Sequence, residues 1–502
     1  MSYFIVNIDF RNFGSVYGAY AYILSIIEAV LIISIYVSPI LLRFAGCLSI
    51  NHDCEEQVTR KFFLESLLIT FGTFLIMYII YYPGAFSPDS MSQYGQAAGF
   101  KDYNDWHPVL HTLFAFTLPL KVTGGWIGSI VLFQIIIFSL ALAYMAYTLA
   151  EFGNIKYARL FLLYILINPA TLGISMYPWK DVSFSVFAML AMTFAVRVYF
   201  SGGEWLKSPS HVIIFVLIMG AATIFRHNAV LFTLPLLIAV MLYVSSWKKK
   251  FLLAAGFALI IFLVRVPLYS HLKVQSPGYR VLETTQLPMT VIGDAITKTP
   301  EKIDKDILDF AYKAVPEETW RKYYITGTFL SVKYKNMNFD VIESAGYMKI
   351  LNMMMRCFRD SFMASLKGML ALTDMVFGVT GSANWIIIPS VYVNSYGIEQ
   401  HGIRFMHKLF VIYSQITRLF FKHIFWHIGV LLLISIIFTL AKVKFRTKSG
   451  WEKLFLVIPL FIHDYGTMLF IGGNDFRYFY CSYLVLPLVL LVLLVNDNIR
   501  HN

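Results

Sequence analysis

Residues 83 to 108 contain the densest group of side chains that could take part in chemistry. An apolar run ends at residue 82, Pro-Gly-Ala-Phe-Ser-Pro-Asp-Ser follows at 83–90, and Trp-His-Pro closes the stretch at 106–108. The prolines remove backbone donors and favour extended residues before them, so this stretch is a loop. In it, Asp89 could act as a catalytic general base, and His107 could orient Asp89 or an acceptor. Each has a structural alternative, because Ser87 or Asp89 could cap a short helix and His107 could simply pack beside Pro108.

A second group of charged residues stands in short turns between apolar runs. Lys-Asp occurs at 180–181, Arg-His-Asn at 226–228 and Asp-Phe-Arg at 475–477. Ionisable groups at a bilayer boundary are costly unless paired or hydrated, so their repeated appearance in such turns favours one shared polar site. Lys180, Arg226 and Arg477 could neutralise a donor phosphate. The residues predicted to support them or to contact an acceptor are Trp106, Asp181, His227, Asn228 and Asp475. For any one residue the alternative is a local ion pair, such as Lys180 with Asp181.

The composition is that of a membrane protein. Of 502 residues, 58% are hydrophobic and 14% are charged, and the mean hydropathy is +0.66. Such a chain is too apolar for a soluble domain. The formal net charge of +12 therefore reports topology rather than nucleic-acid binding. The four cysteines lack the spacing of a metal or disulfide framework, and we expect neither zinc nor disulfides. They are Cys47, Cys54, Cys357 and Cys481.

Apolar runs predict about eleven membrane-spanning helices, because ~20 residues cross a bilayer. They lie at about 19–42, 62–82, 125–150, 158–177, 182–200, 211–226, 229–246, 250–269, 420–441, 453–471 and 478–496. The apolar stretch at 107–120 is shorter and bounded by prolines, so we expect a re-entrant or interfacial helix there. Residues 1–18 lack the basic start and apolar core of a signal peptide, and we expect this segment to be retained.

Lysine and arginine predict the orientation of these spans. Basic residues flank five loops that fall on one side if the spans alternate, which makes that side cytoplasmic. These residues include Arg43, Arg60, Lys61, Lys156, Arg159, Arg197, Lys207, Lys248, Lys249, Lys250, Lys442, Lys444, Arg446 and Lys448. The loop at 83–107, the three charged turns and a long segment at about 270–419 then lie outside. The active site is therefore predicted to be extracytoplasmic, and the N-terminus lies outside if the first span exists.

The long outer segment differs in composition from the spans. From about 270 to 419 hydrophobicity falls, turn residues appear, and helical periodicity runs over 303–314 and 347–372. The predicted fold is an all-α polytopic membrane protein with a mostly helical insert. Its domains are an N-terminal span and loop (1–61), a membrane domain (62–269) with its first outer loop at 83–124, the insert (270–419) and C-terminal spans (420–502). Aromatic residues at 377–385 and 392–396 suit sugar or lipid contact and an ordinary interfacial belt equally well.

The order of these motifs resembles the GT-C superfamily. The motifs are the loop carboxylate, Trp-His-Pro at 106–108, Tyr-Pro-Trp-Lys-Asp at 177–181, Arg-His-Asn at 226–228 and Asp-Phe-Arg-Tyr at 475–478, with Pro487 in the last span. GT-C proteins are polytopic glycosyltransferases that use polyprenyl-phosphate sugars. The resemblance covers about residues 62–496 and is to bacterial members related to mannosyltransferases and aminoarabinose transferases.

The resemblance implies roles for two residues. Asp89 corresponds to the family's catalytic Asp in the first loop, and Arg477 corresponds to its late contact with the lipid phosphate. Two features depart from the family pattern. The family's loop often carries paired acidic residues, whereas Asp89 stands between Pro88 and Ser90. A further span is also predicted before residue 62.

The functional expectation is a glycosyltransferase of the bacterial cytoplasmic membrane. It would transfer a hexosyl or pentosyl group from a polyprenyl-phosphate donor to a cell-envelope glycan, lipid or polymer acceptor. A neutralised phosphate is a good leaving group, so one general base suffices and we expect single displacement with inversion. No cofactor is required by these residues, and a divalent metal stays an open alternative although no compact acidic cluster appears.

Two other functional classes stay open. A polysaccharide polymerase or ligase would act on the same lipid-linked sugars and would depend more on arginines than on Asp89. A transporter (flippase) of a lipid-linked solute would use the same basic residues as a substrate path. It predicts internal repeats and charged clusters near the bilayer midplane, and neither is visible in the sequence.

Overall fold

Helix α10 (Lys180–Phe200) is the centre of the fold. In the computed structural model of the chain, nearly every side chain of this helix is buried. Its sequence is apolar around the whole circumference and contains several Ser and Ala residues, a pattern typical of a helix that is packed on all sides. Helices α7 (Gly128–Phe152), α11 (Pro209–Phe225) and α26 (Tyr480–Leu494) pack against it.

The structure describes residues 42–45, 47–48, 60–276, 280–333, 335–377, 387–443, 447–470 and 475–495. The predicted first span at about 19–42 lies outside these residues except at its last position. Cys54, Lys444, Arg446 and most of the aromatic stretch at 377–385 also lie outside them.

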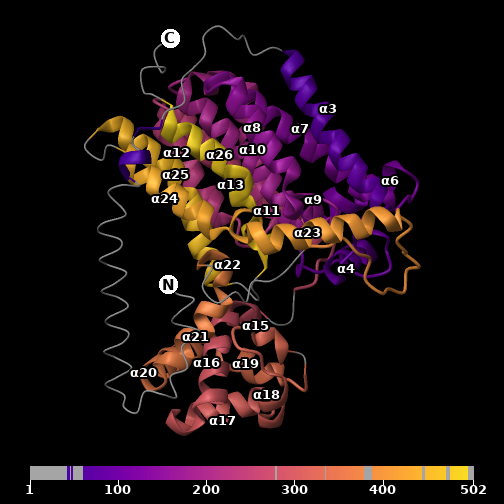
Figure 1. The fold of residues 1–502 in the computed structure, drawn as a ribbon, viewed down its shortest axis with the longest axis vertical. Helices are drawn as coiled ribbons and strands as arrows, with labels where there is room; N and C mark the ends of the chain where they lie inside the picture. The colour runs from indigo at the N-terminus through magenta and orange to yellow at the C-terminus, as the bar shows by residue number, and fades with distance from the viewer. Residues whose placement is uncertain are drawn as a thin grey trace.

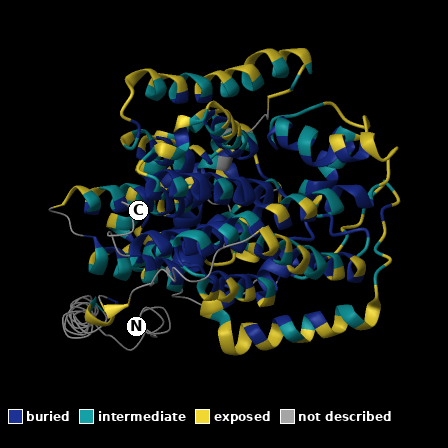
Figure 2. Cartoon of the chain, turned by 90° about the horizontal axis from the view of Figure 1, so that it is seen from above, coloured by how far each residue is buried: buried dark blue, intermediate teal, exposed yellow. Residues whose placement is uncertain are grey.

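A shell of further helices surrounds α10 and its neighbours (Figure 1). They are α3 (Arg60–Ile80), α8 (Ile155–Ile167), α12 (Val230–Leu242), α13 (Trp247–Leu263), α24 (Gly429–Lys442) and α25 (Lys448–Met468). Figure 2 shows a buried interior and an exposed periphery. The peripheral helices expose large apolar side chains, such as Leu68 on α3 and Phe251 on α13. An exposed apolar surface of this kind is stable against lipid but not against water.

The described residues form an all-α membrane protein, as predicted. They contain helices and a few isolated bridges but no strand. Six helical stretches are long and apolar enough to cross a membrane: Arg60–Ile80, Gly128–Phe152, Lys180–Phe200, Trp247–His271, Arg404–Lys442 and Phe476–Leu494. The predicted number of eleven is not confirmed, because helices such as α8, α12 and α24 have fewer than the ~20 residues of a simple span. The predicted span at 158–177 is interrupted, since α8 ends at Ile167 and Asn168 caps a short α9 (Pro169–Ile174).

One end of the bundle carries the short helices that follow α3. They are α4 (Pro88–Ala97), α5 (Val109–His111), the π-helix η2 (Thr112–Thr117) and α6 (Leu118–Val122). The segment predicted to be re-entrant or interfacial is therefore a continuous but irregular helix that packs on α4 and α7. At the same end α3 stops and α10 and α26 begin, and this end is named the Asp89 end.

A separate group of helices lies beyond the Asp89 end in Figure 1. This helical insert consists of α15 (Arg280–Thr284), α16 (Gln286–Lys298), α17 (Lys305–Ala314), α18 (Glu317–Tyr323), α19 (Phe339–Ala345), α20 (Tyr347–Asp360) and α21 (Phe362–Leu372). Its centre is α16, on which the buried Asp294 accepts hydrogen bonds from the Tyr324 hydroxyl at 2.7 Å and the Gly327 amide at 3.1 Å. Helices α17, α20 and α21 coincide with the two ranges of predicted helical periodicity.

The chain returns to the bundle through α22 (Asp374–Phe377) and α23 (Arg404–Phe425). Helix α23 runs across the ends of neighbouring helices in Figure 1 rather than along them. Its backbone leaves helical geometry at Phe421, and it ends at Phe425 before α24 begins at Gly429. The span predicted at 420–441 therefore corresponds to the end of α23, a break and α24.

Candidate functional site

Asp89 lies in the first turn of α4. Ser87 is the N-cap, because its hydroxyl accepts a hydrogen bond from the Ser90 amide at 3.3 Å, and Pro88 begins the helix. The capping role considered for this loop therefore belongs to Ser87. A carboxylate in the first turn is favoured by the helix dipole, and its side chain remains available for other contacts.

Hydrogen bonds fix α4 against α10. The Trp179 indole N–H, next to the start of α10, donates to Ser87 Oγ at 2.7 Å. Further along α4, Gln93 Oε1 lies 2.6 Å from His111 Nδ1, whose other ring nitrogen lies 3.0 Å from Ser183 Oγ on α10. The contacts of His111 are buried and that of Trp179 is partly buried, and together they hold the turn that carries Asp89 in one position.

Arg477 contacts Asp89 directly. Its Nη1 donates to Asp89 Oδ2 at 2.9 Å, and its Nε lies 3.1 Å from Asp475 Oδ2. Asp475 also accepts the Arg477 amide at 3.0 Å, so this carboxylate caps the short helix η7 (Phe476–Phe479) and fixes the guanidinium. The guanidinium lies 5.0 Å from the ring centre of Trp179 and 5.1 Å from that of Tyr478, which adds cation–π attraction.

The Asp89–Arg477 pair is only partly buried. The Asp89 side chain is 34% exposed and that of Arg477 is 19% exposed. Within the described part of the chain, nothing donates a hydrogen bond to Asp89 Oδ1. That oxygen can therefore accept a proton from a ligand, and the pair can be reached from solvent.

His107 and Lys180 flank the pair. His107 Nε2 lies 3.9 Å from Asp89 Oδ1, and its ring is almost completely buried. Burial and the nearby Lys180 charge lower the pKa of His107 well below its usual value, so its imidazole is neutral at pH 7. Lys180 Nζ lies 3.5 Å from the carbonyl oxygen of Trp106, which brings the loop and the start of α10 together.

The two carboxylates around Arg477 differ in their proton affinity. Partial burial acts to raise the pKa of Asp89, but the positive charges of Arg477 and Lys180 outweigh it and lower the value to about 2. Partial burial raises the pKa of Asp475, although Arg477 counteracts the effect. Asp89 is therefore fully ionised at neutral pH, and its weak basicity is a consequence of the cations beside it.

A second ion pair lies deeper, beneath the first. Arg226 Nε lies 3.1 Å from Asp181 Oδ1, and their side chains are 6% and 2% exposed. Arg226 Nη1 also donates to the carbonyl oxygen of Tyr478 at 2.9 Å, next to Arg477 in the chain. The guanidinium lies over the rings of Phe184 and Tyr478. Arg226 thus supports the backbone that carries Arg477 and is itself remote from solvent.

His227 and Asn228 lie in a neighbouring cluster rather than against Asp89. His227 Nδ1 lies 3.2 Å from Arg265 Nη2, and Arg265 Nη1 donates to Asp105 Oδ2 at 2.8 Å. Asn228 Nδ2 donates to Thr467 Oγ1 of α25 at 3.0 Å. These contacts attach the turn after α11 to the loop before α5 and to α25, which makes them supports of the loop geometry.

The structure also shows a polar cluster that the sequence analysis missed. Asp464 on α25 lies 2.7 Å from His463 Nδ1 and accepts the Ser482 hydroxyl of α26 at 2.6 Å and 2.7 Å, with all three side chains buried. Asp464 precedes the end of α25 at Met468 by four residues, which is about 6 Å along a helix. The available signal was an adjacent His and Asp inside the apolar run at 453–471.

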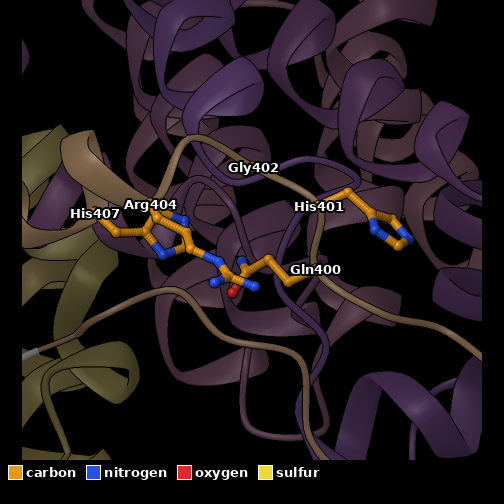
Figure 3. A pocket seen from close by; sticks show the side chains of 5 residues that line it. All are labelled: Gln400, His401, Gly402, Arg404 and His407. Carbon is orange, nitrogen blue, oxygen red and sulfur yellow. The ribbon is translucent and has the colours of Figure 1, made fainter.

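A cavity of about 380 Å³ lies elsewhere, at the start of α23. Figure 3 shows its lining residues, Gln400, His401, Gly402, Arg404 and His407. Gln400 Nε2 lies 3.4 Å from the Tyr81 carbonyl oxygen, so the cavity is next to the segment that leads from α3 to the Asp89 loop. Neither Asp89 nor Arg477 lines it. In the portion of the chain that the structure describes, no three His, Cys, Asp or Glu side chains are grouped to hold a metal ion.

No family model, no curated protein and no solved structure matches this chain. A function for these residues must therefore come from their geometry and charge, together with the motif order described above.

Proposed function

We propose that this protein is a membrane glycosyltransferase that transfers a sugar from a polyprenyl-phosphate donor to a cell-envelope acceptor on the outer side of the membrane. The main support is the partly exposed Asp89–Arg477 pair beside Lys180. A carboxylate that can take a proton stands next to cations that can hold a phosphate, which are the two requirements of this transfer. The motif order typical of GT-C proteins supports the same assignment.

Arg477 and Lys180 bind the donor phosphate in this proposal. Lys180 begins α10, where the unpaired backbone N–H groups and the helix dipole favour an anion. The guanidinium of Arg477 offers several donors, of which Nη1 is used by Asp89 in the unliganded protein. We do not assign Arg226 as a third phosphate ligand, because its side chain is buried and its Nε and Nη1 already contact Asp181 and the Tyr478 carbonyl. Its role is to position Arg477.

Donor binding also prepares the base. A phosphate that takes Arg477 and Lys180 as partners neutralises the charges that keep the pKa of Asp89 near 2. The pKa of Asp89 then rises, and the carboxylate becomes a stronger base when the donor is in place. In the unliganded protein Asp89 is thus held in an ion pair with Arg477. Donor binding breaks this pair and leaves Asp89 able to act as the base.

The reaction is a single displacement. The acceptor hydroxyl oxygen attacks the anomeric carbon from the face opposite the phosphate, and its proton passes to Asp89. The bond between that carbon and the phosphate oxygen breaks, and the electron pair leaves with the phosphate held by Arg477 and Lys180. The neutral His107 imidazole lies on the Oδ1 side of Asp89 and orients the acceptor or the carboxylate. The product has inverted configuration at the anomeric carbon.

The test compares binding of a polyprenyl phosphate with binding of the matching polyprenol, which lacks the phosphate. Purified wild-type protein is expected to prefer the phosphate. Arg477→Gln is expected to lose roughly 2 to 5 kcal/mol of that preference, because a charge-assisted contact to a partly desolvated phosphate is removed. Lys207→Gln is the control, since Lys207 is exposed and pairs with Glu204 at the other end of the bundle. Equal binding by wild type and Arg477→Gln would contradict the phosphate role.

A transporter of a lipid-linked solute is the second candidate, and the buried Asp464–His463–Ser482 cluster is the observation that favours it. A transporter moves a fluorescent polyprenyl-phosphate lipid across a liposome membrane without changing it, and Asp464→Asn would slow this movement. A glycosyltransferase releases polyprenyl phosphate from its donor in the same liposomes. A polymerase or ligase releases it too, and the length of the glycan product separates that class from a transferase that adds one sugar.

A further inference from the structure

Helix α23 has an exposed apolar face. Large side chains at helical spacing point away from the protein, whereas Phe410, Ser414 and Thr417 form the buried face. Two of the exposed side chains, Leu419 and Phe420, are 75% and 70% accessible. The exposed residues that form this apolar face are Phe405, Leu409, Ile412, Ile416, Leu419 and Phe420. Such a face is unstable in water and needs an apolar partner.

A row of basic residues borders this apolar face along one flank. Arg404, Lys408 and Arg418 recur at helical spacing and project roughly 100° from the apolar face, because each stands one position before an apolar residue. All three are exposed. A helix with lysine and arginine beside an apolar face is typical of helices that lie flat in a lipid–water interface.

The attachments of α23 show that it crosses the ends of other helices. At its start, the Ile403 amide and His407 Nε2 contact the Ile80 carbonyl oxygen, the end of α3, at 3.0 Å and 2.9 Å. One turn and a half later, the Tyr413 hydroxyl donates to the Ile167 carbonyl oxygen, the end of α8. Both α3 and α8 end on the same side of the bundle, so α23 bridges two helix ends at one level. A spanning helix would instead contact its neighbours at successive depths.

We propose that α23 lies in the plane of the outer lipid leaflet, with its apolar face on the acyl chains and its basic row on anionic phospholipid headgroups. The partner is a lipid surface, and the charge of the row selects lipids such as phosphatidylglycerol. Of the stretch Arg404–Lys442, only the second part, α24, then enters the hydrocarbon core. This inference does not depend on the reaction proposed above.

The position of α23 also determines the depth of the candidate site relative to the lipid headgroups. The His401 amide donates to the Tyr82 carbonyl oxygen at 2.9 Å, and a Cβ on Gly402 would clash with the Ile80 carbonyl oxygen. Helix α23 is thus attached directly to the segment that leads into the Asp89 loop. With α23 at the headgroup level, Asp89 and Arg477 lie close to the level at which a lipid-linked phosphate is presented.

Depth measurements on the full chain in lipid nanodiscs test the orientation. Cys47 and Cys54 are replaced by serine, while Cys357 and Cys481 are buried and are expected not to react with the label. Nitroxide labels are then placed singly at Phe405, Ile412 and Leu419, and their depth is obtained from collisions with oxygen and with a water-soluble nickel complex. An in-plane helix gives one depth for all three labels. A spanning helix gives a steady change of about 20 Å from the first label to the last, at ~1.5 Å per residue, and that result would overturn the proposal.

Lipid selectivity is tested with a fluorophore on Val411, which lies within the basic row. Quenching by nitroxide-labelled phosphatidylglycerol is compared with quenching by nitroxide-labelled phosphatidylcholine. Wild type is expected to favour phosphatidylglycerol, and neutralisation of the row by Arg404→Gln, Lys408→Gln and Arg418→Gln reduces this preference by about fivefold per charge removed. The matched control neutralises three exposed lysines of the helical insert: Lys302→Gln, Lys305→Gln and Lys313→Gln. Equal quenching by both lipids in wild type would refute the role of the basic row.

Discussion

Two carboxylate–arginine pairs are stacked at the Asp89 end, and they differ in exposure. Asp89 is 34% exposed in its pair with Arg477, whereas Asp181 is 2% exposed in its pair with Arg226. The two pairs are linked, because Arg226 also holds the Tyr478 carbonyl next to Arg477. A partly hydrated pair can exchange one partner for a ligand at small cost, but a buried pair cannot open without leaving a charge in an apolar environment. The outer pair is therefore suited to chemistry and the inner pair to support.

The largest effect is expected from Asp89→Asn. This variant keeps the shape of the outer pair but removes the base, so the transfer rate should fall roughly 10²- to 10⁴-fold while donor binding persists. The measurement is release of polyprenyl phosphate from a labelled donor. Asp102→Asn is the matched control, since Asp102 is an exposed carboxylate in the same loop that contacts only Gln275 among the described side chains. An unchanged rate in Asp89→Asn would show that Asp89 is not the base, and the outer pair would then have no chemical role that the inner pair lacks.

Asp475→Asn tests whether the two carboxylates that contact Arg477, Asp89 and Asp475, have different roles. Both oxygens of Asp475 accept contacts from Arg477, so this carboxylate positions the guanidinium. We expect weaker donor binding with a rate constant at saturation close to that of wild type. If Asp475→Asn instead lost the rate and kept the binding, Asp475 and not Asp89 would be the base.

Breaking the inner pair should mainly affect stability. Arg226→Met leaves Asp181 buried without its partner, and we expect a loss of about 3–5 kcal/mol in the free energy of unfolding in detergent micelles. A second variant that combines Arg226→Met with Asp181→Asn removes the unpaired charge and should recover part of this loss. Arg477→Met should destabilise the protein less than Arg226→Met, because Asp89 remains hydrated. If Arg226→Met and Arg477→Met lost the same free energy of unfolding, the difference in exposure would not determine how much each pair stabilises the protein.

The pH dependence should distinguish free and donor-bound protein. A carboxylate base is active only when deprotonated, so the rate falls as pH drops through its pKa. In the free protein the pKa of Asp89 is about 2, and kcat/KM should fall only in strong acid. In the donor complex the phosphate has taken Arg477, the pKa of Asp89 is higher, and kcat should begin to fall at a higher pH than kcat/KM. If kcat and kcat/KM fell at the same acidic pH, the idea that Arg477 exchanges Asp89 for the donor phosphate would be contradicted.

The smallest effect is expected at Trp179. Trp179→Phe keeps an aromatic face beside Arg477 but removes the indole N–H that donates to Ser87 Oγ at 2.7 Å. One lost hydrogen bond is worth about 1 kcal/mol, so thermal unfolding should shift slightly and activity should change by less than it does in Asp89→Asn. Trp179→Leu removes both contacts and should weaken donor binding further.

The sequence predicted which residues come together better than it predicted their partners. Asp89, Lys180 and Arg477 lie at one end of the bundle because each follows or precedes an apolar helix in alternating order, and that order is visible in the sequence. The pairing of Asp181 was not predictable in this way. Adjacent residues at the start of a helix project about 100° apart, so Lys180 turns toward the Trp106 carbonyl while Asp181 turns inward to Arg226.

Helix boundaries limited the topology prediction. Hydropathy counts residues but does not detect a change of direction, so the break between α23 and α24 was hidden inside the span predicted at 420–441. The Asp464–His463 cluster was missed for a related reason, because two polar residues hardly change the mean hydropathy of a span. Its recognition required the position of Ser482 on α26, which the sequence alone does not supply.

In the proposed in-plane orientation of α23, its attachment to residues 80–82 gives the Asp89 loop a mechanical link to the bilayer. A change in membrane thickness or curvature displaces a helix that lies flat in one leaflet, while α3 follows the hydrocarbon core as a whole. The hydrogen bonds from His401 and Ile403 to Tyr82 and Ile80 transmit the difference to the backbone just before Asp89. Acyl-chain length then becomes a variable of the proposed reaction, and we expect different rates in thin and thick membranes.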